Sequence, residues 1–369
     1  MSGEAIEVTY RVRSPAAWLP ARAEALLLEQ TVELPRAALR SAFVREEIVG
    51  RVLATEPAGE DAFLVTIEQP AAAAADDPAQ LLNVLFGNSS LQPDVELVDV
   101  RVPESLARVF GGPRFGLAGL RRLTGVQGRA LTASALKPMG LAPAEMAALC
   151  RTFALAGIDV IKDDHGLADH PFCPFVERVR ACLEATRDAA QTTGRRALYV
   201  PNLIGSPIAV LRQVRQAQDL GVEAVMVSPM LLGLPILQDL VRCGLPVLAH
   251  PALGGAPRFN PKALLGKLFP LFGADAVIYP NVGGRFSYSA ETCAELAATL
   301  RAGGPAVAPA LPVPAGGMKT DGLGAALEFH GADTMLLIGG SLLESPDAEI
   351  LLARSRGFVE AVRSFSYRT

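Results

Sequence analysis

The feature that most constrains the fold is a regular alternation of apolar strands and amphipathic helices from about residue 128 to the end of the chain. A glycine near the end of a helix often precedes the next strand, as Gly157, Gly194 and Gly221 do. We expect strands at 130–137, 159–164, 197–203, 222–229, 245–251, 275–282, 309–315 and 333–339. Eight strand–helix units in about 240 residues predict a (β/α)8 barrel, whereas a doubly wound open sheet would have fewer units and a glycine-rich first loop.

The first 128 residues predict a smaller α+β unit. The expected elements are a strand at 6–12, a helix at 20–29, two strands within 47–69, a helix from Asp77-Pro78 and a strand at 95–102. This βαββαβ order is that of a ferredoxin-like sandwich. The predicted fold class is therefore α/β, with a ferredoxin-like N-terminal domain at 1–128 and a (β/α)8 barrel carrying the active site at 129–369.

Composition excludes several classes of function. Half of the residues are hydrophobic, the net charge is −4 and the pI is about 5.7, so no basic surface for nucleic acid is expected. The N-terminus lacks a basic signal region and no apolar run reaches membrane-spanning length, so no membrane association is expected. Five cysteines without metal-binding spacing are typical of buried thiols in a reducing cytoplasm.

Lysine is rare in this chain, which has 29 arginines and five lysines, at positions 137, 162, 262, 267 and 319. Arginine cannot become a neutral amine, act as a base or form a carbamate or imine near neutral pH. Lys262 and Lys267 lie in an expected helix and fit ordinary solvated roles. Lys137 and Lys162 instead end apolar strands, where burying a charged amine is unfavourable unless a partner or a function compensates for it.

The second expected strand ends in a cluster of ionisable groups, Lys162-Asp163-Asp164-His165, followed by Gly166. Such a cluster at the end of a buried strand must be balanced by its own charges, a metal or a ligand. One interpretation is a local ion pair of Lys162 with Asp163 or Asp164. The other is a functional site, because barrel chemistry occurs at the C-terminal ends of the strands.

The other strand ends carry further polar residues and two glycine pairs. The full set is Lys137; Lys162, Asp164 and His165; Asn202; Ser228; His250; Asn281; Gly316 and Gly317; and Gly339 and Gly340. Glycine pairs after strands seven and eight favour a phosphate site, since glycine lets backbone N–H groups approach an anion closely. His170 and His330 fall in a loop and at a helix end, where structural roles are expected.

These motifs resemble the ribulose bisphosphate carboxylase superfamily over nearly the whole chain. The stretches that carry the resemblance are 136–138, 157–164, 313–317 and 338–340 in the barrel, and Phe86-Gly87-Asn88 in the N-terminal domain. The strand-two stretch is the most specific of them.

The resemblance implies an enzyme that forms an enolate. Lys162 would react with CO2 to give a carbamate, which with Asp164 and His165 would hold Mg²⁺ or another divalent metal. Lys137 would be the base or acid, and His250 would keep the strand-five catalytic position. The phosphate would lie at Gly316, Gly317, Gly339 and Gly340, with Asn281 and Arg285 as further substrate contacts. A homodimer is implied, in which Asn88 reaches the barrel mouth of the partner subunit.

The chain departs from the carboxylases at several positions. His165 replaces a glutamate ligand, and imidazole is a poor match for Mg²⁺, so a softer metal or a different role for His165 is open. Met139, Pro251 and Ala315 replace a lysine, an arginine and a serine, and Arg285 is the only stand-in for a mobile lysine. These losses remove the second phosphate clamp and the groups that handle CO2 addition. A carboxylase of ribulose bisphosphate is therefore not expected; the substrate should carry one phosphate.

The sequence leaves several reactions open. We favour C–C cleavage, by decarboxylation or hydrolysis, of a 3-oxo sugar acid phosphate such as 3-oxo-isoapionate 4-phosphate, because His165 and Arg285 could meet a carboxylate. The alternative is a methionine-salvage enolase or isomerase acting on a methylthio-pentulose phosphate, with an apolar slot from Met139, Phe259 or Phe286. A Schiff-base aldolase using Lys137 or Lys162, or a binding or redox-regulatory protein without catalysis, would also fit.

Overall fold

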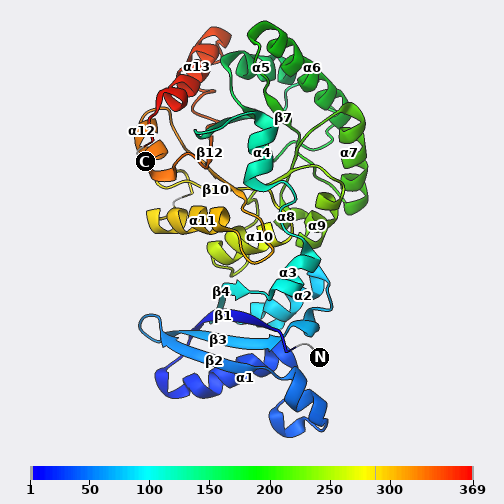
Figure 1. Ribbon diagram of the computed structural model, residues 1–369, viewed down its shortest axis with the longest axis vertical. Helices are drawn as coiled ribbons and strands as arrows, with labels where there is room; N and C mark the ends of the chain where they lie inside the picture. The colour runs from blue at the N-terminus through cyan, green and yellow to red at the C-terminus, as the bar shows by residue number, and fades with distance from the viewer. Residues whose placement is uncertain (1–2, 287, 368–369) are drawn as a thin grey trace.

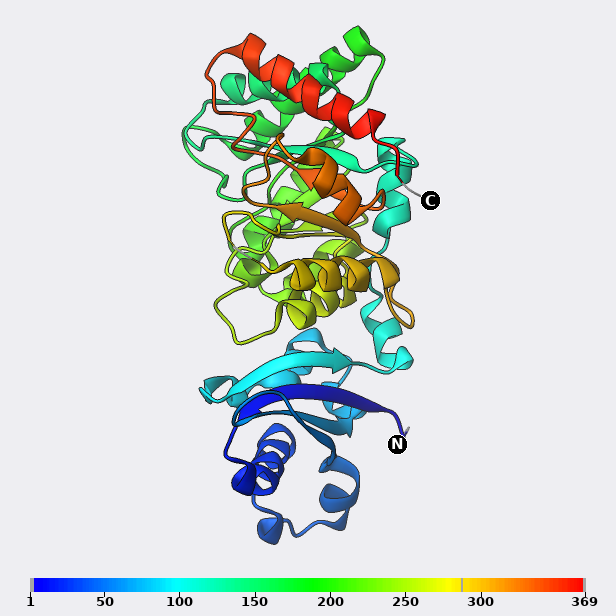
Figure 2. The same cartoon turned by 90° about the vertical axis from the view of Figure 1, so that its left-hand side faces the viewer.

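The structure is a computed structural model that describes residues 3–286 and 288–367. It has two parts arranged along its long axis, a smaller N-terminal sheet domain and a barrel ringed by helices (Figures 1 and 2). Both parts agree with the predicted fold class. Among the described residues, no helix combines the length and the apolar composition that a membrane crossing needs.

The N-terminal domain is a four-stranded antiparallel sheet with two helices on one face. Its elements are β1 Ala5–Arg13, α1 Leu19–Thr31, β2 Arg51–Pro57, β3 Ala62–Pro70, α2 Pro78–Phe86 and β4 Val95–Arg101, in the sheet order β2-β3-β1-β4. Alternate residues of β1, among them Val8 and Tyr10, are buried, as expected for a strand with one face against helices. Asp77 caps α2 by accepting from Gln80 N at 2.8 Å, as the sequence predicts.

Two further helices, α3 Glu104–Phe110 and α4 Gly116–Thr124, connect the sheet domain to the barrel. In Figure 1, α4 crosses one end of the barrel. Its Leu120 belongs to the cluster of buried side chains inside the barrel, and Leu117 N donates to Pro309 O, just before β11, at 2.9 Å. Helix α4 therefore covers the N-terminal end of the barrel, although it precedes residue 129.

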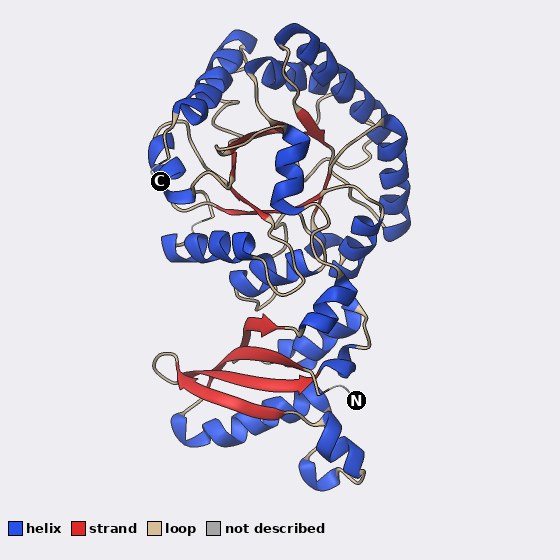
Figure 3. Cartoon of the chain, in the orientation of Figure 1, coloured by secondary structure: helices blue, strands red, loops and turns tan. Residues whose placement is uncertain are grey.

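The barrel strands lie where the alternating pattern predicts them. They are β5 Leu131–Leu136, β6 Val160–Asp163, β7 Leu198–Val200, β8 Val225–Val227, β9 Val247–Ala249, β10 Ala276–Pro280, β11 Leu311–Ala315 and β12 Met335–Leu337. The helices between and after them are α5 Pro143–Ala156, α6 Phe175–Thr193, α7 Pro207–Leu220, α8 Pro229–Leu232, α9 Leu234–Arg242, α10 Phe269–Leu271, α11 Ala290–Ala302, α12 Leu323–His330 and α13 Ala348–Ser364. A π-helix, Lys262–Leu268, precedes α10. Figure 3 shows the helices surrounding the strands, which is the arrangement of a (β/α)8 barrel.

The barrel strands form two four-stranded parallel sheets, β12-β5-β6-β7 and β11-β10-β9-β8. A bridge between Asn202 and Met226 joins β7 to β8. At the other junction, β11 and β12 form no ladder among the described residues. Leu311 N donates to Asp275 O on the β10 side, so Pro312 and the alternate Pro314 face β12, where they have no N–H to donate.

Candidate functional site

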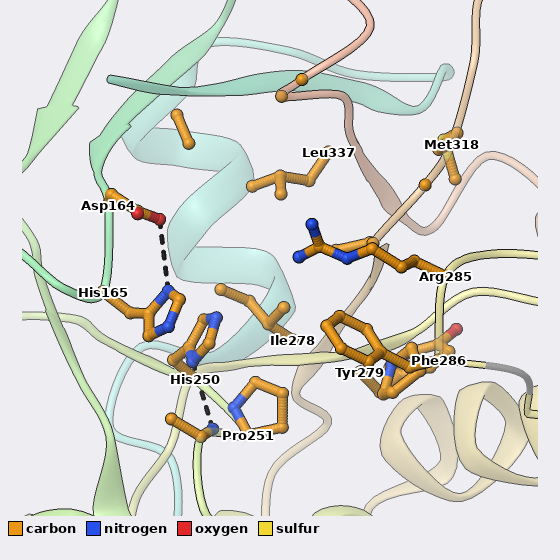
Figure 4. Close-up of a pocket in the computed structure, with 18 of the residues that line it drawn as sticks. Asp164, His165, His250, Pro251, Ile278, Tyr279, Arg285, Phe286, Met318 and Leu337 are labelled. Atoms are coloured by element: carbon orange, nitrogen blue, oxygen red, sulfur yellow. Dashed lines mark hydrogen bonds and ion pairs between the residues drawn. The ribbon is translucent and has the colours of Figure 1, made fainter. Parts of the chain in front are cut away.

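A pocket of about 690 Å³ opens at the C-terminal ends of the barrel strands. It brings together most of the residues predicted from the strand ends (Figure 4). The predicted residues that line it are Lys137, Lys162, Asp164, His165, His250, Arg285, Gly316, Gly317, Gly339 and Gly340. The two lysines thus share one cavity, as the proposed chemistry requires.

Lys137 and Asp164 form an ion pair across neighbouring strands, with Lys137 Nζ 2.7 Å from Asp164 Oδ1. Burial alone would raise the pKa of Asp164, but hydrogen bonds from His165 and Lys137 and the charges of both lysines hold it well below its usual range. Lys162 is only 2% exposed. Burial, with the charge of Lys137, lowers the pKa of Lys162 to about 8 against the opposing charge of Asp164. About a tenth of this amine is therefore neutral at pH 7, far more than for a lysine in water.

The local ion pair between Lys162 and Asp163 is not formed. Lys162 Nζ donates to the backbone O of Asp163 at 2.8 Å. The Asp163 carboxylate, which is fully buried, accepts from Arg178 Nε at 3.0 Å and from Tyr199 OH at 2.7 Å. Asp163 therefore supports the fold behind the strand, while Asp164 faces the pocket.

Two histidines stack at one side of the pocket. The rings of His165 and His250 lie 4.1 Å apart between centroids and 9° from parallel. His165 Nδ1 lies 3.2 Å from Asp164 Oδ1. His250 Nδ1 accepts from Ala252 N at 3.1 Å, and burial with the charge of Lys162 holds the pKa of His250 well below its usual range. His250 is therefore a neutral imidazole whose Nε2–H can donate to a ligand.

The first glycine pair lies beside the turn that follows β10, whereas a Cβ on Gly339 of the second pair would stand 3.8 Å from Lys137 Cε. Gly316 and Gly317 have left-handed φ values of +85° and +92°, and a Cβ on Gly317 would stand 2.7 Å from Arg285 N. Only glycine suits this close approach. The Arg285 guanidinium lies 4.8 Å from the centre of the Phe286 ring and extends into the pocket in Figure 4. The pocket thus has cationic and backbone groups on its β10–β12 side.

Asn281 corrects one prediction. It was expected to contact substrate, but its side chain is 7% exposed and does not line the pocket. Its Oδ1 accepts instead from His330 Nε2, at 2.9 Å. Asn88 is exposed in a short helix, Asn88–Leu91, outside the pocket of its own chain, so its predicted contact with a partner subunit stays a prediction.

Sequence reasoning missed several residues of the pocket. Lys319, Ser341 and Glu344 lie in loops after the glycine pairs, where no strand end drew attention to them. Apolar lining was also underestimated. Of the three side chains proposed for an apolar slot, Phe286 lines the pocket, while Met139 and Phe259 do not. The apolar lining comprises Leu253, Leu265, Ile278, Phe286, Met318 and Leu337.

The divalent metal that the resemblance implies would need more ligands than the unmodified side chains supply. Within the described part of the chain, no three His, Cys, Asp or Glu side chains are grouped closely enough to hold a metal. Asp164 and His165 supply one carboxylate and one imidazole. A carbamate on the low-pKa amine of Lys162 would add an anionic oxygen ligand beside them. The residues therefore fit a divalent ion when Lys162 is carbamylated.

Taken together, the barrel, its paired lysines and its glycine turns fit the class of enolate-forming enzymes that the sequence resembles. Comparison with known proteins makes the class specific. The family described as "Ribulose bisphosphate carboxylase large chain, catalytic domain" matches residues 116–253. The chain is 50% identical to "Ribulose bisphosphate carboxylase-like protein 1" of Rhodopseudomonas palustris, over 92% of this chain and 93% of that protein. It is 42% identical to "5-methylthioribulose-1-phosphate isomerase" of Rhodospirillum rubrum, over 98% and 97%.

Solved structures agree with the sequence relatives. A Rubisco-like protein from Rhodopseudomonas palustris superposes with a TM-score of 0.92 at 44% identity, covering 100% of both chains. A Rubisco-like protein (MtnW) from Alicyclobacillus acidocaldarius gives 0.88 at 30% identity, covering 98% of this chain and 94% of that one. The chain belongs to the ribulose bisphosphate carboxylase family, within its carboxylase-like group.

Proposed function

We propose that this enzyme isomerises a methylthio-pentulose phosphate by moving a proton from a carbon next to the substrate carbonyl to the carbonyl carbon itself. The observation that carries the proposal is that one pocket combines the Lys137–Asp164 pair with glycine turns and apolar side chains. The name of the Rhodospirillum rubrum relative, which matches nearly the whole chain, supports the same reaction.

The polar side of the pocket supplies groups for proton transfer. As a neutral amine released from its ion pair with Asp164, which lies 2.7 Å away, Lys137 Nζ would take the proton from the carbon next to the carbonyl. The resulting ammonium would return that proton to the former carbonyl carbon, so that no atom is gained or lost. His250 Nε2–H would donate to a substrate oxygen while the negative charge of the enediolate develops. A divalent ion held by Asp164, His165 and carbamylated Lys162 would polarise the carbonyl when bound.

The apolar lining of the pocket supports the methylthio substrate over the sugar acid that the sequence favoured. A thioether is apolar and polarisable, and it packs well against aromatic and aliphatic side chains. Phe286, which borders Gly316, and Met318, which follows Gly317, offer such a surface, and Leu253 adds an apolar side chain from the loop after β9. Arg285, proposed to meet a substrate carboxylate, stands over the Phe286 ring and equally suits the phosphate. The sugar-acid reaction therefore remains a second candidate, with only the cationic groups in its favour.

The test is to incubate the enzyme with 5-methylthioribulose 1-phosphate in D2O and follow deuterium uptake and product by NMR. We expect an isomer carrying deuterium at the former carbonyl carbon, and Lys137→Met should reduce exchange by about 10²- to 10⁴-fold. Turnover of 3-oxo-isoapionate 4-phosphate without exchange into the methylthio sugar would overturn the assignment.

The same assay separates the metal-assisted reaction from a Schiff-base aldolase. EDTA treatment should abolish exchange, and added Mg²⁺ or Mn²⁺ with bicarbonate should restore it. An aldolase using Lys137 or Lys162 would resist EDTA and would give a substrate adduct that borohydride traps.

The predicted homodimer bears on the completeness of the pocket. Exposed Asn88 lies beside Leu91, which is 81% exposed, on the same short helix of the N-terminal domain. We propose that this helix meets the barrel mouth of a second copy. Asn88→Ala should then weaken substrate binding while the free energy of unfolding stays the same.

A further inference from the structure

Asn202, which directly follows β7 and Pro201, anchors the loop that carries the proposed metal ligands. Its side chain is 1% exposed. Asn202 Nδ2 donates to two carbonyl oxygens of that loop, His165 O at 3.0 Å and Leu167 O at 2.9 Å. Its backbone N donates to Asp163 Oδ2 at 3.1 Å. One residue therefore holds the backbone that follows Asp164 and the side chain of the residue that precedes it, without reaching the pocket itself.

Asn281, which follows β10, has the corresponding place on the other side of the barrel. Its backbone N donates to Ala315 O at 2.7 Å, and its carbonyl accepts from Gly284 N at 3.1 Å. Its side-chain Oδ1 accepts from His330 Nε2 at 2.9 Å. An asparagine Oδ1 can only accept a hydrogen bond, so His330 Nε2 is the donor. His330 therefore holds the Asn281 side chain from behind the strand.

The turn that begins at Asn281 is joined directly to the first glycine pair. Arg285 N donates to Gly316 O at 2.8 Å, and Gly284 Cα lies 3.2 Å from the place where a Cβ of Gly317 would stand. Moving this turn would therefore move both Arg285 and the glycine turn. Asn281 thus anchors the proposed phosphate side of the pocket, just as Asn202 anchors the proposed metal side.

We propose that Asn202 and Asn281 are positioning residues, each of which fixes one half of the pocket independently of the other. Asn202 sets the loop 164–174, with Asp164 and His165; Asn281, held by His330, sets the turn 281–286 and the adjoining glycines. The assignment of ligands to the two halves rests on the proposed function, but the two anchoring contacts do not.

The two asparagines act with opposite hydrogen-bonding roles, which gives an unusually selective test. Asn202 acts through its donor, so Asn202→Asp turns a carboxylate oxygen towards two carbonyl oxygens and breaks the anchor. Asn281 acts through its acceptor, so Asn281→Asp keeps the bond from His330, whereas Asn281→Leu removes it. Substitutions of the same kind at two buried strand ends should therefore have different consequences.

The experiment measures backbone hydrogen exchange by mass spectrometry, Mn²⁺ binding by electron paramagnetic resonance with bicarbonate present, and inorganic phosphate binding by calorimetry. For Asn202→Asp we expect faster exchange in 164–174 and at least tenfold weaker Mn²⁺ binding, with phosphate affinity within twofold of wild type. For Asn281→Leu we expect faster exchange in 281–286 and about tenfold weaker phosphate binding, with Mn²⁺ binding unchanged. Asn281→Asp should match wild type in all three.

Equal effects of Asn202→Asp and Asn281→Asp, or loosening of both segments by either change, would overturn the proposal. Should Asn202→Asp fail to fold, Asn202→Ala leaves space for a water that can donate to the carbonyls, and a smaller rise in exchange confined to 164–174 is expected. Wild-type exchange in that variant would also overturn it. If wild-type protein did not bind Mn²⁺, the proposed metal site would be wrong, but the anchoring roles would not be affected, since backbone hydrogen exchange does not depend on metal.

Discussion

The two ends of the barrel both contain buried charges, but they satisfy them differently. At the N-terminal end, Asp159 accepts from Arg129 NH1 and NH2, each at 2.8 Å, and from Thr132 N at 2.8 Å. Asp275 accepts from three backbone N–H groups there. At the C-terminal end, Lys162 faces a cavity with a single backbone partner. A charge whose partners are all within the fold stabilises it, whereas a charge turned to a cavity is available to a ligand.

The largest expected effect is at the C-terminal end. Lys162→Arg keeps the positive charge but cannot become a neutral amine or a carbamate, so solvent-deuterium exchange into substrate should fall at least about thousandfold. Lys262→Arg, which keeps its ion pair with Glu295, is the matched control and should be unaffected. If Lys162→Arg showed unchanged exchange and an unchanged melting temperature, the charge at the C-terminal end would have no role in catalysis.

Breaking a charge at the N-terminal end should affect stability alone. Asp159→Asn removes the bidentate partner of Arg129 and should lower the free energy of unfolding by about 3–5 kcal/mol in urea denaturation. The turnover of the folded fraction should not change. Asp333→Asn, which breaks the ion pair of Arg121 with a carboxylate that is 55% exposed, should cost about 1 kcal/mol or less. A loss of turnover in Asp159→Asn would contradict a purely structural role.

The buried His330 allows a test by the pH dependence of the free energy of unfolding. Burial lowers the pKa of His330 to about 4, so the folded state favours its neutral form. The resulting stability is complete above the unfolded pKa of about 6.5 and is lost as pH falls towards 4. Between pH 7.5 and pH 5, wild type should lose about 2 kcal/mol more unfolding free energy than His330→Gln. Parallel losses in the two proteins would show that His330 does not titrate in this way.

The smallest expected effect within the pocket concerns Gly340, which separates the role of a ligand contact from that of the fold. A Cβ on Gly340 would have no protein atom within 4 Å, so a methyl group there meets only what enters the pocket. Gly340→Ala should weaken inorganic phosphate binding about tenfold, or about 1.4 kcal/mol, in calorimetry. Gly324→Ala, equally free of neighbours but in α12, should bind phosphate normally. Equal affinities would place the phosphate elsewhere.

The barrel and the main pocket residues could be predicted because their signals are local. Apolar runs gave the strands, and Lys162, Asp164 and both glycine pairs lie at strand ends, where parallel strands bring them to one edge. Pairings between distant residues could not be predicted in this way. Arg178 reaches Asp163 from within α6. The sequence signal for this contact was an arginine on the apolar, buried face of that helix.

Asn281 shows the limit of reasoning from strand ends alone. Its place in the chain is correct for a pocket residue, yet its partner is His330, 49 residues later. Likewise, α4 lies outside the repeating pattern, and its role under the barrel depends on side chains of strands that follow it. The local sequence determines where a polar residue lies along a strand. Which partner its side chain contacts depends on residues that pack against it from elsewhere in the chain.

The missing ladder between β11 and β12 has a consequence for how this pocket can diversify. Side-chain contacts span that junction, such as Thr334 Oγ1 donating to Pro312 O at 3.1 Å, and the two glycine turns flank it. Widening the gap between them would rupture fewer main-chain bonds than at any laddered pair. Substrates of different width could therefore be accommodated by substitutions along that seam, with Lys162, on β6, left undisturbed.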